Sequence, residues 1–144
     1  FVKPLKAGSS YGITKVTKEE DMENAIQQAF LYDNQVLIEE NIEGFEVGCA
    51  VTGNQELFCG RVDEIELAKE LEIQIQETAK LIYQCLGCKG MARVDLFLTP
   101  GGELVFNEVN TIPGFTSHSR FPNMMKGVGL EFSQLLDQII SLSI

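Results

Sequence analysis

Hydrophobic and polar positions along the chain follow two periods, which predict strands and helices in a mixed order. Alternating or strongly β-prone runs predict extended segments over residues 1–3, 13–16, 36–40, 47–52, 56–62, 90–98 and 103–110. Apolar residues at helical spacing predict helices over residues 18–31 and 69–86, and a last helix from about Phe132. This order indicates an α+β protein with mixed or antiparallel sheets packed by helices, rather than a run of βαβ units.

Local signals mark where several of these elements begin and end. Thr17 and Glu20 have the Thr-x-x-Glu spacing of a capping box before the first helix. Gly53 and Asn54 predict a hairpin turn, and Gly87 is expected to close the second helix.

The predicted hairpin over residues 91–110 carries the strongest chemical signal. On its first strand Arg93, Asp95 and Phe97 share a face. Strict alternation on its second strand gives one face to four residues, Leu104, Phe106, Glu108 and Asn110, and the other to Val105, Asn107 and Val109. With a connection of even length, Glu108 and Asn110 join Arg93 and Asp95, whereas an odd connection separates the two pairs.

Together these side chains have the chemistry of a metal site for phosphate. The oxygens of Asp95, Glu108 and Asn110 are hard ligands of the kind that Mg²⁺ uses alongside substrate phosphates. Arg93 beside them is suited to stabilise developing negative charge. The alternative is a structural salt bridge around one arginine, which the sequence leaves open.

Two further segments and one residue could take part in binding or catalysis. Lys3 precedes a glycine-bordered loop, Gly8–Gly12, that suits phosphate oxygens or forms an ordinary hairpin tip. The run from Glu39 to Glu46 is either a solvated acidic edge or an edge that binds a purine and its ribose. His118 is the only histidine, and we expect it to be a loop residue rather than a catalytic base.

Composition narrows the possible partners. The 144 residues are 44% hydrophobic and carry a formal net charge of −10, which argues against non-specific nucleic-acid binding. No apolar run approaches the ~20 residues that span a bilayer, so no membrane partner is expected. Because the chain opens within a strand pattern, we expect it to be part of a longer protein.

The four cysteines favour a reducing compartment. Cys85 and Cys88 have C-x-x-C spacing, but no second such pair completes a zinc site. A redox or metal role is the less favoured alternative, and reduced thiols in a cytoplasmic protein are expected.

The motifs, in this order, resemble the D-alanine–D-alanine ligase family of ATP-grasp enzymes. The matching segments are Val2-Lys3-Pro4 with Gly8-Ser9-Ser10-x-Gly12, Val36-Leu37-Ile38-Glu39-Glu40, Ala92-Arg93-Val94-Asp95, and the long segment from Asn107 to Ser119. The resemblance implies an ATP-grasp fold with the nucleotide between two lobes. Residues 1–44 would be part of the central lobe and residues 45–144 the C-terminal lobe.

The resemblance also implies an ATP site. Lys3 would bind the phosphates, and the loop with Ser9 and Ser10 would close over them. The remaining nucleotide contacts would come from Glu39 to Ile42 along the adenine, with hydrogen bonds from the backbones of Glu40 and Ile42, from Glu46 at the ribose and from Phe97 on the base.

The remaining implied roles concern metal and amino acids. Asp95, Glu108 and Asn110 would bind Mg²⁺ or Mn²⁺. Arg93 and the Gly114 amide would form the oxyanion site, with Ser9 near the first amino acid. Ser119 would hold the carboxylate of the second amino acid.

One position points to a particular branch of the family. Arg120 replaces the aliphatic residue expected after His118-Ser119, which looks like the VanG-type D-alanine–D-serine ligases of vancomycin resistance. The stretch from Gly60 to Leu67 is also similar to that type, so Asp63 and Arg120 would shape a pocket for the serine hydroxyl. A polar pocket favours a hydroxyl that an aliphatic pocket leaves unpaired.

The implied function is ATP-dependent ligation of D-alanine to D-serine, through a D-alanyl phosphate, for peptidoglycan and cell-wall synthesis. Alternatives are a D-alanine–D-alanine ligase and, in another class, a non-catalytic ATP-binding module. The family's N-terminal domain and the ω-loop expected after Leu67 have no counterpart in the sequence. This chain alone is therefore expected to be poorly active, and the full-length protein to be a cytoplasmic homodimer.

Overall fold

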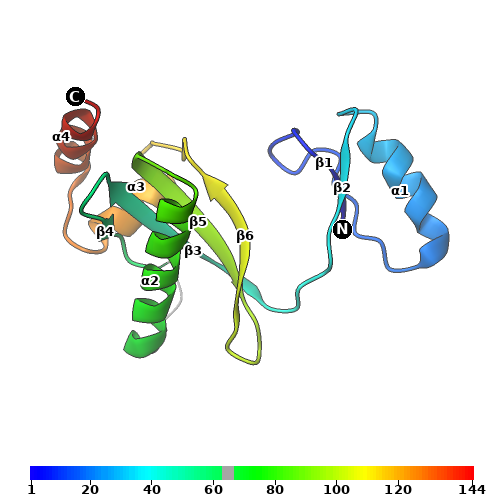
Figure 1. The fold of residues 1–144 in the computed structure, drawn as a ribbon, viewed down its shortest axis with the longest axis horizontal. Helices are drawn as coiled ribbons and strands as arrows, with labels where there is room; N and C mark the ends of the chain where they lie inside the picture. Colours follow the sequence, from blue (N-terminus) through cyan, green and yellow to red (C-terminus); the bar gives the residue numbers. More distant parts are fainter. Residues whose placement is uncertain (63–66) are drawn as a thin grey trace. The chain divides into compact units, whose positions relative to one another are not determined.

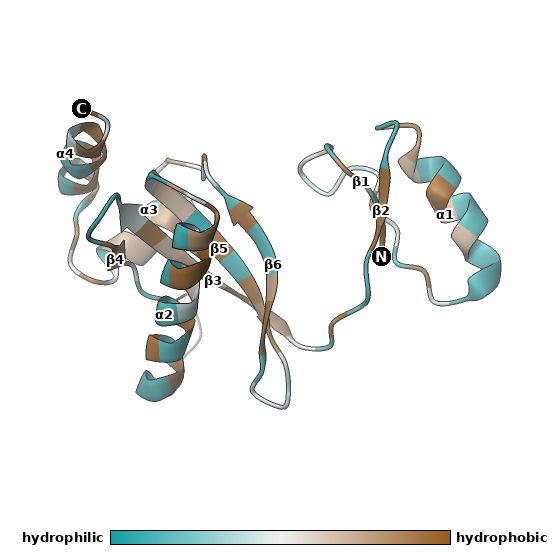
Figure 2. Cartoon of the chain, viewed as in Figure 1, coloured by the Kyte–Doolittle hydropathy of each residue, from teal (hydrophilic) through white to brown (hydrophobic). Residues whose placement is uncertain are grey.

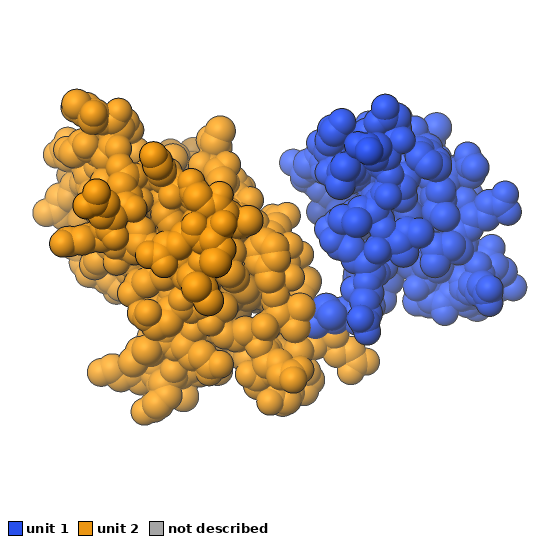
Figure 3. Space-filling model, viewed as in Figure 1, with its two compact units in different colours: residues 1–42 blue, residues 43–144 orange. Residues whose placement is uncertain are grey.

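The computed structural model describes residues 1–62 and 67–144, which form two compact units, Phe1–Ile42 and Glu43–Ile144 (Figures 1 and 3). Each unit has a core of its own. Asp63, predicted to contact the second amino acid, lies outside the described residues.

The smaller unit packs one helix on a pair of strands. β1 (Val2–Pro4) and β2 (Val36–Ile38) are antiparallel, and a 3-10 turn, η1 (Glu19–Asp21), leads into α1 (Met22–Ala29). Val2, Ala25 and Ala29 form its buried centre. The predicted capping box is wrong, because Lys18 precedes the first turn and no side chain caps it. Three acids in that turn instead complement the positive end of the helix dipole.

The larger unit is a four-stranded antiparallel sheet between helices (Figure 1). The strand order is β4 (Phe58–Cys59), β3 (Phe45–Gly53), β5 (Gly90–Leu98), β6 (Leu104–Asn110). α2 (Lys69–Cys85) packs on one face, and α3 (Arg120–Lys126) and α4 (Phe132–Leu142) pack on the other. The predicted α+β class with antiparallel sheets is confirmed.

The face under α2 is the main hydrophobic core. Ile75, Ala79 and Tyr83 of α2 are buried against the alternate residues of β3 and β5 that point to them. The alternation of hydrophobic and hydrophilic residues along α2 is visible in Figure 2. Tyr83 donates its hydroxyl proton to the Gly53 carbonyl oxygen at 2.8 Å, and burial raises the pKa of its phenol to about 12.

The β5–β6 hairpin contains a register shift that strict alternation did not predict. Leu96 pairs with Phe106, but Asp95 pairs with Glu108, so Asn107 is an extra residue of the β-bulge kind. Leu104 and Phe106 therefore share a face with Val109 and not with Glu108, which corrects the predicted faces of this strand.

The prediction also missed α3, and it made β4 too long. α3 has only seven residues, with Pro122 in its first turn, so the sequence shows barely two helical turns. Gly60 lets the chain pass close to this helix, since a Cβ there would meet Met124 atoms at 2.9–3.0 Å. No helix in the described ranges is long and apolar enough to cross a membrane.

Candidate functional site

The face of the sheet opposite α2 gathers most of the predicted site residues, and we call it the site face. Three rows of cross-strand pairs define it: Glu46 with Phe97 and Val105, Gly48 with Asp95 and Glu108, and Ala50 with Arg93 and Asn110. Paired residues point to the same face of a sheet. The predicted grouping of Arg93, Asp95, Glu108 and Asn110 on one face is therefore confirmed.

The reason for this grouping differs from the one predicted. The connection from Leu98 to Leu104 spans Thr99 to Glu103, which is an odd number of residues and would separate the two pairs. The extra residue at Asn107 reverses the alternation once more and returns Glu108 and Asn110 to the site face.

Asp95 and Arg93 form the buried centre of this face. Asp95 is 1% exposed, and both of its oxygens accept hydrogen bonds from Arg93, at 2.8 and 2.9 Å from Nε and 2.7 Å from Nη2. A carboxylate so far from water requires such a partner. The salt bridge considered as an alternative is thus present, and it leaves Glu108 exposed beside it on the next strand.

The oxygen ligands on this face suit a divalent cation that also binds water and phosphate. Asp95, Glu108 and Asn110 offer hard oxygens from neighbouring positions on two strands. Among the described residues no three His, Cys, Asp or Glu side chains gather around one point. Mg²⁺ ordinarily takes one or two carboxylates and completes its shell with water and phosphate, so this set suits it. Asn110 Oδ1 also accepts a hydrogen bond from the Ile112 N–H at 3.1 Å, which orients the amide.

Arg120 reaches this face from the first residue of α3. Its Nη1 lies 3.0 Å from Glu46 Oε1, and its Nη2 lies 3.7 Å from Asp95 Oδ1. The structure therefore brings a residue predicted for the second amino acid into contact with one predicted for ribose and one for metal.

The segment after β6 is held by short-range hydrogen bonds. Ser119 Oγ accepts from the Thr116 N–H at 3.0 Å and lies 2.9 Å from Thr116 Oγ1. A Cβ at Gly114 would stand 3.0 Å from Ser119 Oγ, so only glycine lets the two segments meet here without displacement. His118 is exposed, as expected of a loop residue.

In the smaller unit, Lys3 and Glu39 form an ion pair with 2.6 Å between Nζ and Oε2. Backbone hydrogen bonds of 2.8 Å in both directions also join Phe1 and Glu39. In the part of the chain that the structure describes, the backbone groups of Glu40 and Ile42 have no protein partner, so they are available to a base edge.

The loop with Ser9 and Ser10 has the backbone of a tight turn. Both residues have positive φ values, 55° and 60°, and the Tyr11 N–H donates to the Gly8 carbonyl oxygen at 3.2 Å. Positive φ at both central positions is typical of a type I′ turn, and two serines there cost backbone strain. Strain of this kind concentrates at functional sites.

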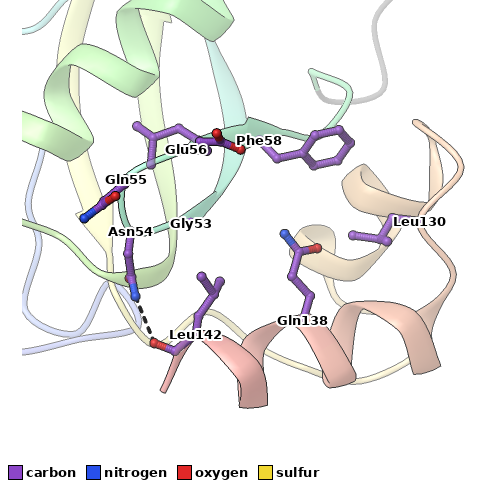
Figure 4. Close-up of a pocket in the computed structure, with 9 residues that line it drawn as sticks. Gly53, Asn54, Gln55, Glu56, Phe58, Leu130, Gln138 and Leu142 are labelled. Carbon is purple, nitrogen blue, oxygen red and sulfur yellow. Dashed lines mark hydrogen bonds between the residues drawn. The ribbon is translucent and has the colours of Figure 1, made fainter. Parts of the chain in front are cut away.

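Two features escaped the sequence prediction. The contact of Arg120 with Glu46 joins residues 74 positions apart, so no local pattern indicates it. An open hollow of about 730 Å³ lies between the turn after β3 and α4, with Asn54, Phe58 and Gln138 among its lining residues (Figure 4). The predicted site residues do not line this hollow.

The family model of the D-Ala D-Ala ligase C-terminus matches residues 1–71 and 64–141. The vancomycin B-type resistance protein VanB of Enterococcus faecalis is 44% identical over 173 aligned positions, which cover the whole chain and 51% of that protein. D-alanine–D-alanine ligase A of Escherichia coli K12 is 40% identical over all of this chain and 46% of its own length. The chain thus spans about half the length of these relatives.

Two solved structures bear on the fold and the branch. The VanG D-Ala:D-Ser ligase of Enterococcus faecalis superposes with a TM-score of 0.95 and 52% identity, over all of this chain and 49% of that one. The D-alanine–D-alanine ligase of Bacillus anthracis complexed with ATP gives a TM-score of 0.84 at 29% identity, over 99% of this chain and 49% of that one. The resemblance based on the motifs is confirmed, and the chain belongs to the D-Ala D-Ala ligase C-terminus family with the ATP-grasp fold.

Proposed function

We propose that the protein containing this chain is an ATP-dependent ligase that joins D-alanine to D-serine through a D-alanyl phosphate. The product would enter peptidoglycan precursors that confer vancomycin resistance. The observation that carries the proposal is Arg120, the residue after His118-Ser119, in a chain 52% identical to a VanG D-Ala:D-Ser ligase. Residues 1–44 would serve as part of the central ATP-grasp lobe and residues 45–144 as the C-terminal lobe.

The obstacle in such a reaction is repulsion between a carboxylate and a phosphate. Arg93 is fixed by Asp95 and stands ready to stabilise charge that develops beside it. Lys3, once it leaves Glu39, adds a second cation for the phosphates. Mg²⁺, when bound by Asp95, Glu108 and Asn110, would supply further neutralisation of phosphate oxygens.

The other proposed roles concern the nucleotide, the oxyanion and the second amino acid. The nucleotide would contact the backbones of Glu40 and Ile42, with Glu39 beside them, the carboxylate of Glu46 and the ring of Phe97. Glu46 and Phe97 are direct cross-strand neighbours, as a ribose contact and a base contact should be. Ser9 and Ser10 would cover the phosphates, the Gly114 amide would donate to the oxyanion, and Ser119 and Arg120, with Asp63, would hold the second amino acid.

The oligomer and the compartment are part of the same proposal. We expect the full-length protein to be a homodimer in the cytoplasm, where ATP and the D-amino acids are present. Size-exclusion chromatography with light scattering tests the dimer.

A D-alanine–D-alanine ligase is the second candidate, favoured by the 40% identity to the Escherichia coli enzyme. Phosphate release by the protein as its gene encodes it, with D-serine and with D-alanine as second substrate, separates the two. We expect a preference for D-serine, and a clear preference for D-alanine would refute the assignment.

The role of Arg120 is tested by Arg120→Leu. This change should lower the ratio of D-serine to D-alanine rates more than it lowers total activity. Lys126→Leu, at the exposed end of the same helix, is the matched control and should leave the ratio unchanged. An unchanged ratio in Arg120→Leu would remove Arg120 from the recognition of the second substrate.

A further inference from the structure

The ion pair between Arg120 and Glu46 connects two parts of the site that the proposed function keeps separate. Arg120 is assigned to the second amino acid, and Glu46 is assigned to the ribose of ATP. We propose that Glu46 is also a positioning residue for Arg120 and thereby helps to determine which second amino acid is selected. This inference rests on the proposed function and adds a specificity role to a residue of the nucleotide site.

The backbone of Arg120 is fixed, whereas its side chain requires partners. Three residues of α3 are buried against the sheet and anchor the helix: Phe121, Met124 and Met125. The side chain of Arg120 is 39% exposed, so packing alone does not select its rotamer. Contacts with fixed acceptors must therefore set the direction of the guanidinium.

Of the two carboxylates on the site face that contact Arg120, Glu46 is the nearer. It contacts Nη1 at 3.0 Å, while Asp95 lies 3.7 Å from Nη2. The Asp95 carboxylate is already engaged by three short hydrogen bonds from Arg93, so it offers Arg120 a weaker hold. Within the described residues Arg120 is the one ion-pair partner of Glu46. Contacts at both terminal nitrogens restrain the orientation of a planar guanidinium, and removal of the nearer of these two contacts weakens that restraint.

The same carboxylate can serve both purposes. Arg120 uses Oε1 of Glu46, and a carboxylate has about four acceptor sites over its two oxygens. A ribose hydroxyl can therefore bind Glu46 while Arg120 stays in place. Because linkage is reciprocal, occupation of the ribose site would then influence the affinity for the second amino acid.

The test is Glu46→Gln in the protein as its gene encodes it. Initial rates of phosphate release are measured at saturating ATP with D-serine and with D-alanine as second substrate. The ratio of kcat/KM for D-serine to kcat/KM for D-alanine should fall about three- to five-fold, as expected for the loss of one exposed ion pair. The fall should come from a higher KM for the preferred second amino acid. Because the change is isosteric and Glu46 is exposed, the fold should stay intact. Glu103→Gln, an exposed glutamate in the β5–β6 turn, is the control and should not change the ratio.

A double variant identifies the route of the effect. In an Arg120→Leu background, Glu46→Gln should cause no further change of the ratio, because its effect acts through Arg120. An unchanged ratio in Glu46→Gln, with only KM for ATP raised, would overturn the inference while leaving the proposed function standing. An equal further loss in the double variant would also overturn it. Absence of amino-acid-dependent phosphate release by the wild type would refute the proposed function and the inference with it.

Discussion

The two faces of the four-stranded sheet differ in how far their apolar surface extends. Under α2 the face is apolar along its length, with seven buried residues on β3 and β5: Val47, Cys49, Val51, Ala92, Val94, Leu96 and Leu98. On the site face the apolar surface stops at Ala50 and Met91, where α3 and α4 pack. Arg93 and Asn110 stand in the same cross-strand row as Ala50, and the next row carries Asp95 and Glu108.

One strand, β5, therefore contributes alternate residues to the hydrophobic core and to the proposed site. Apolar residues on the α2 face gain free energy by leaving water. A buried ion pair such as Arg93–Asp95 gains little net stability, because desolvation offsets the attraction. Its presence in the centre of the sheet is therefore better explained by function than by folding.

Leu96→Ala should give the largest effect on stability. The residue is fully buried under α2, so truncation should lower the free energy of unfolding by about 2–5 kcal/mol. Val105→Ala, on the half-buried edge of the site face, should cost less than ~1 kcal/mol. Urea unfolding of both variants measures the two losses of unfolding free energy. Equal losses would contradict the conclusion that the α2 face contributes most of the stability.

The ion pair offers the next test. Asp95→Ala leaves Arg93 without its partner and should destabilise by about 3 kcal/mol. The double change Arg93→Met with Asp95→Leu should restore most of that stability, since apolar replacement of a buried pair is often neutral. The same double variant should lose metal-dependent ATP binding. If the double variant were as unstable as Asp95→Ala, the ion pair itself would be required for the stability of the fold.

Deletions in β6 test the extra residue. Deleting Asn107 removes the register shift, while Phe106 still pairs with Leu96 and Glu108 still pairs with Asp95. The free energy of unfolding should therefore change by no more than ~1 kcal/mol. Deleting Val105 instead turns Asn107 toward the α2 face and Phe106 toward the site face, which should cost about 1–3 kcal/mol. Similar costs for the two deletions would argue against the assigned register.

Tyr83→Phe should give the smallest change in stability at neutral pH, and this change should depend on pH in alkaline solution. Folding raises the pKa of its phenol from about 10 to about 12, so the neutral form is favoured in the folded state. This contribution is complete below pH 10 and is lost as pH rises toward 12. Tyr83→Phe should cost about 1 kcal/mol at neutral pH, from the lost hydrogen bond to Gly53. Wild type loses this contribution across that pH range and the variant does not, so the stability difference between them should shrink and then reverse its sign. A constant difference would contradict the assignment.

The sequence predicted the elements whose pattern is dense and local. β5 was predicted with its observed bounds, because apolar and charged residues alternate from Ala92 to Leu96 and turn residues follow Leu98. Arg93 and Asp95 share a face by their spacing alone. The hairpin was harder to predict, because the sequence left the length of its connection open. The connection has an odd length, and the extra Asn107 restores the grouping that an even connection would have given. Neither turn length nor a bulge has a reliable local signature there.

The features that the sequence did not predict depend on contacts over long separations. α3 is too short to show a clear period, and its packing depends on Gly60, far away in the chain. The pairing of Arg120 with Glu46 requires both α3 and the start of β3 to be in place. Such contacts follow from the packed fold and not from spacing.

The proposed metal site, in which Asp95, Glu108 and Asn110 hold the divalent ion that accompanies ATP, is tested most directly by the Mg²⁺ dependence of ATP turnover. Phosphate release as a function of Mg²⁺ concentration is measured for wild type, Glu108→Gln and the control Glu103→Gln. Glu108→Gln should raise the Mg²⁺ requirement and lower kcat about 10²–10³-fold, and Glu103→Gln should leave both unchanged. A Glu108→Gln variant with the Mg²⁺ dependence and turnover of the wild type would contradict the proposed metal site.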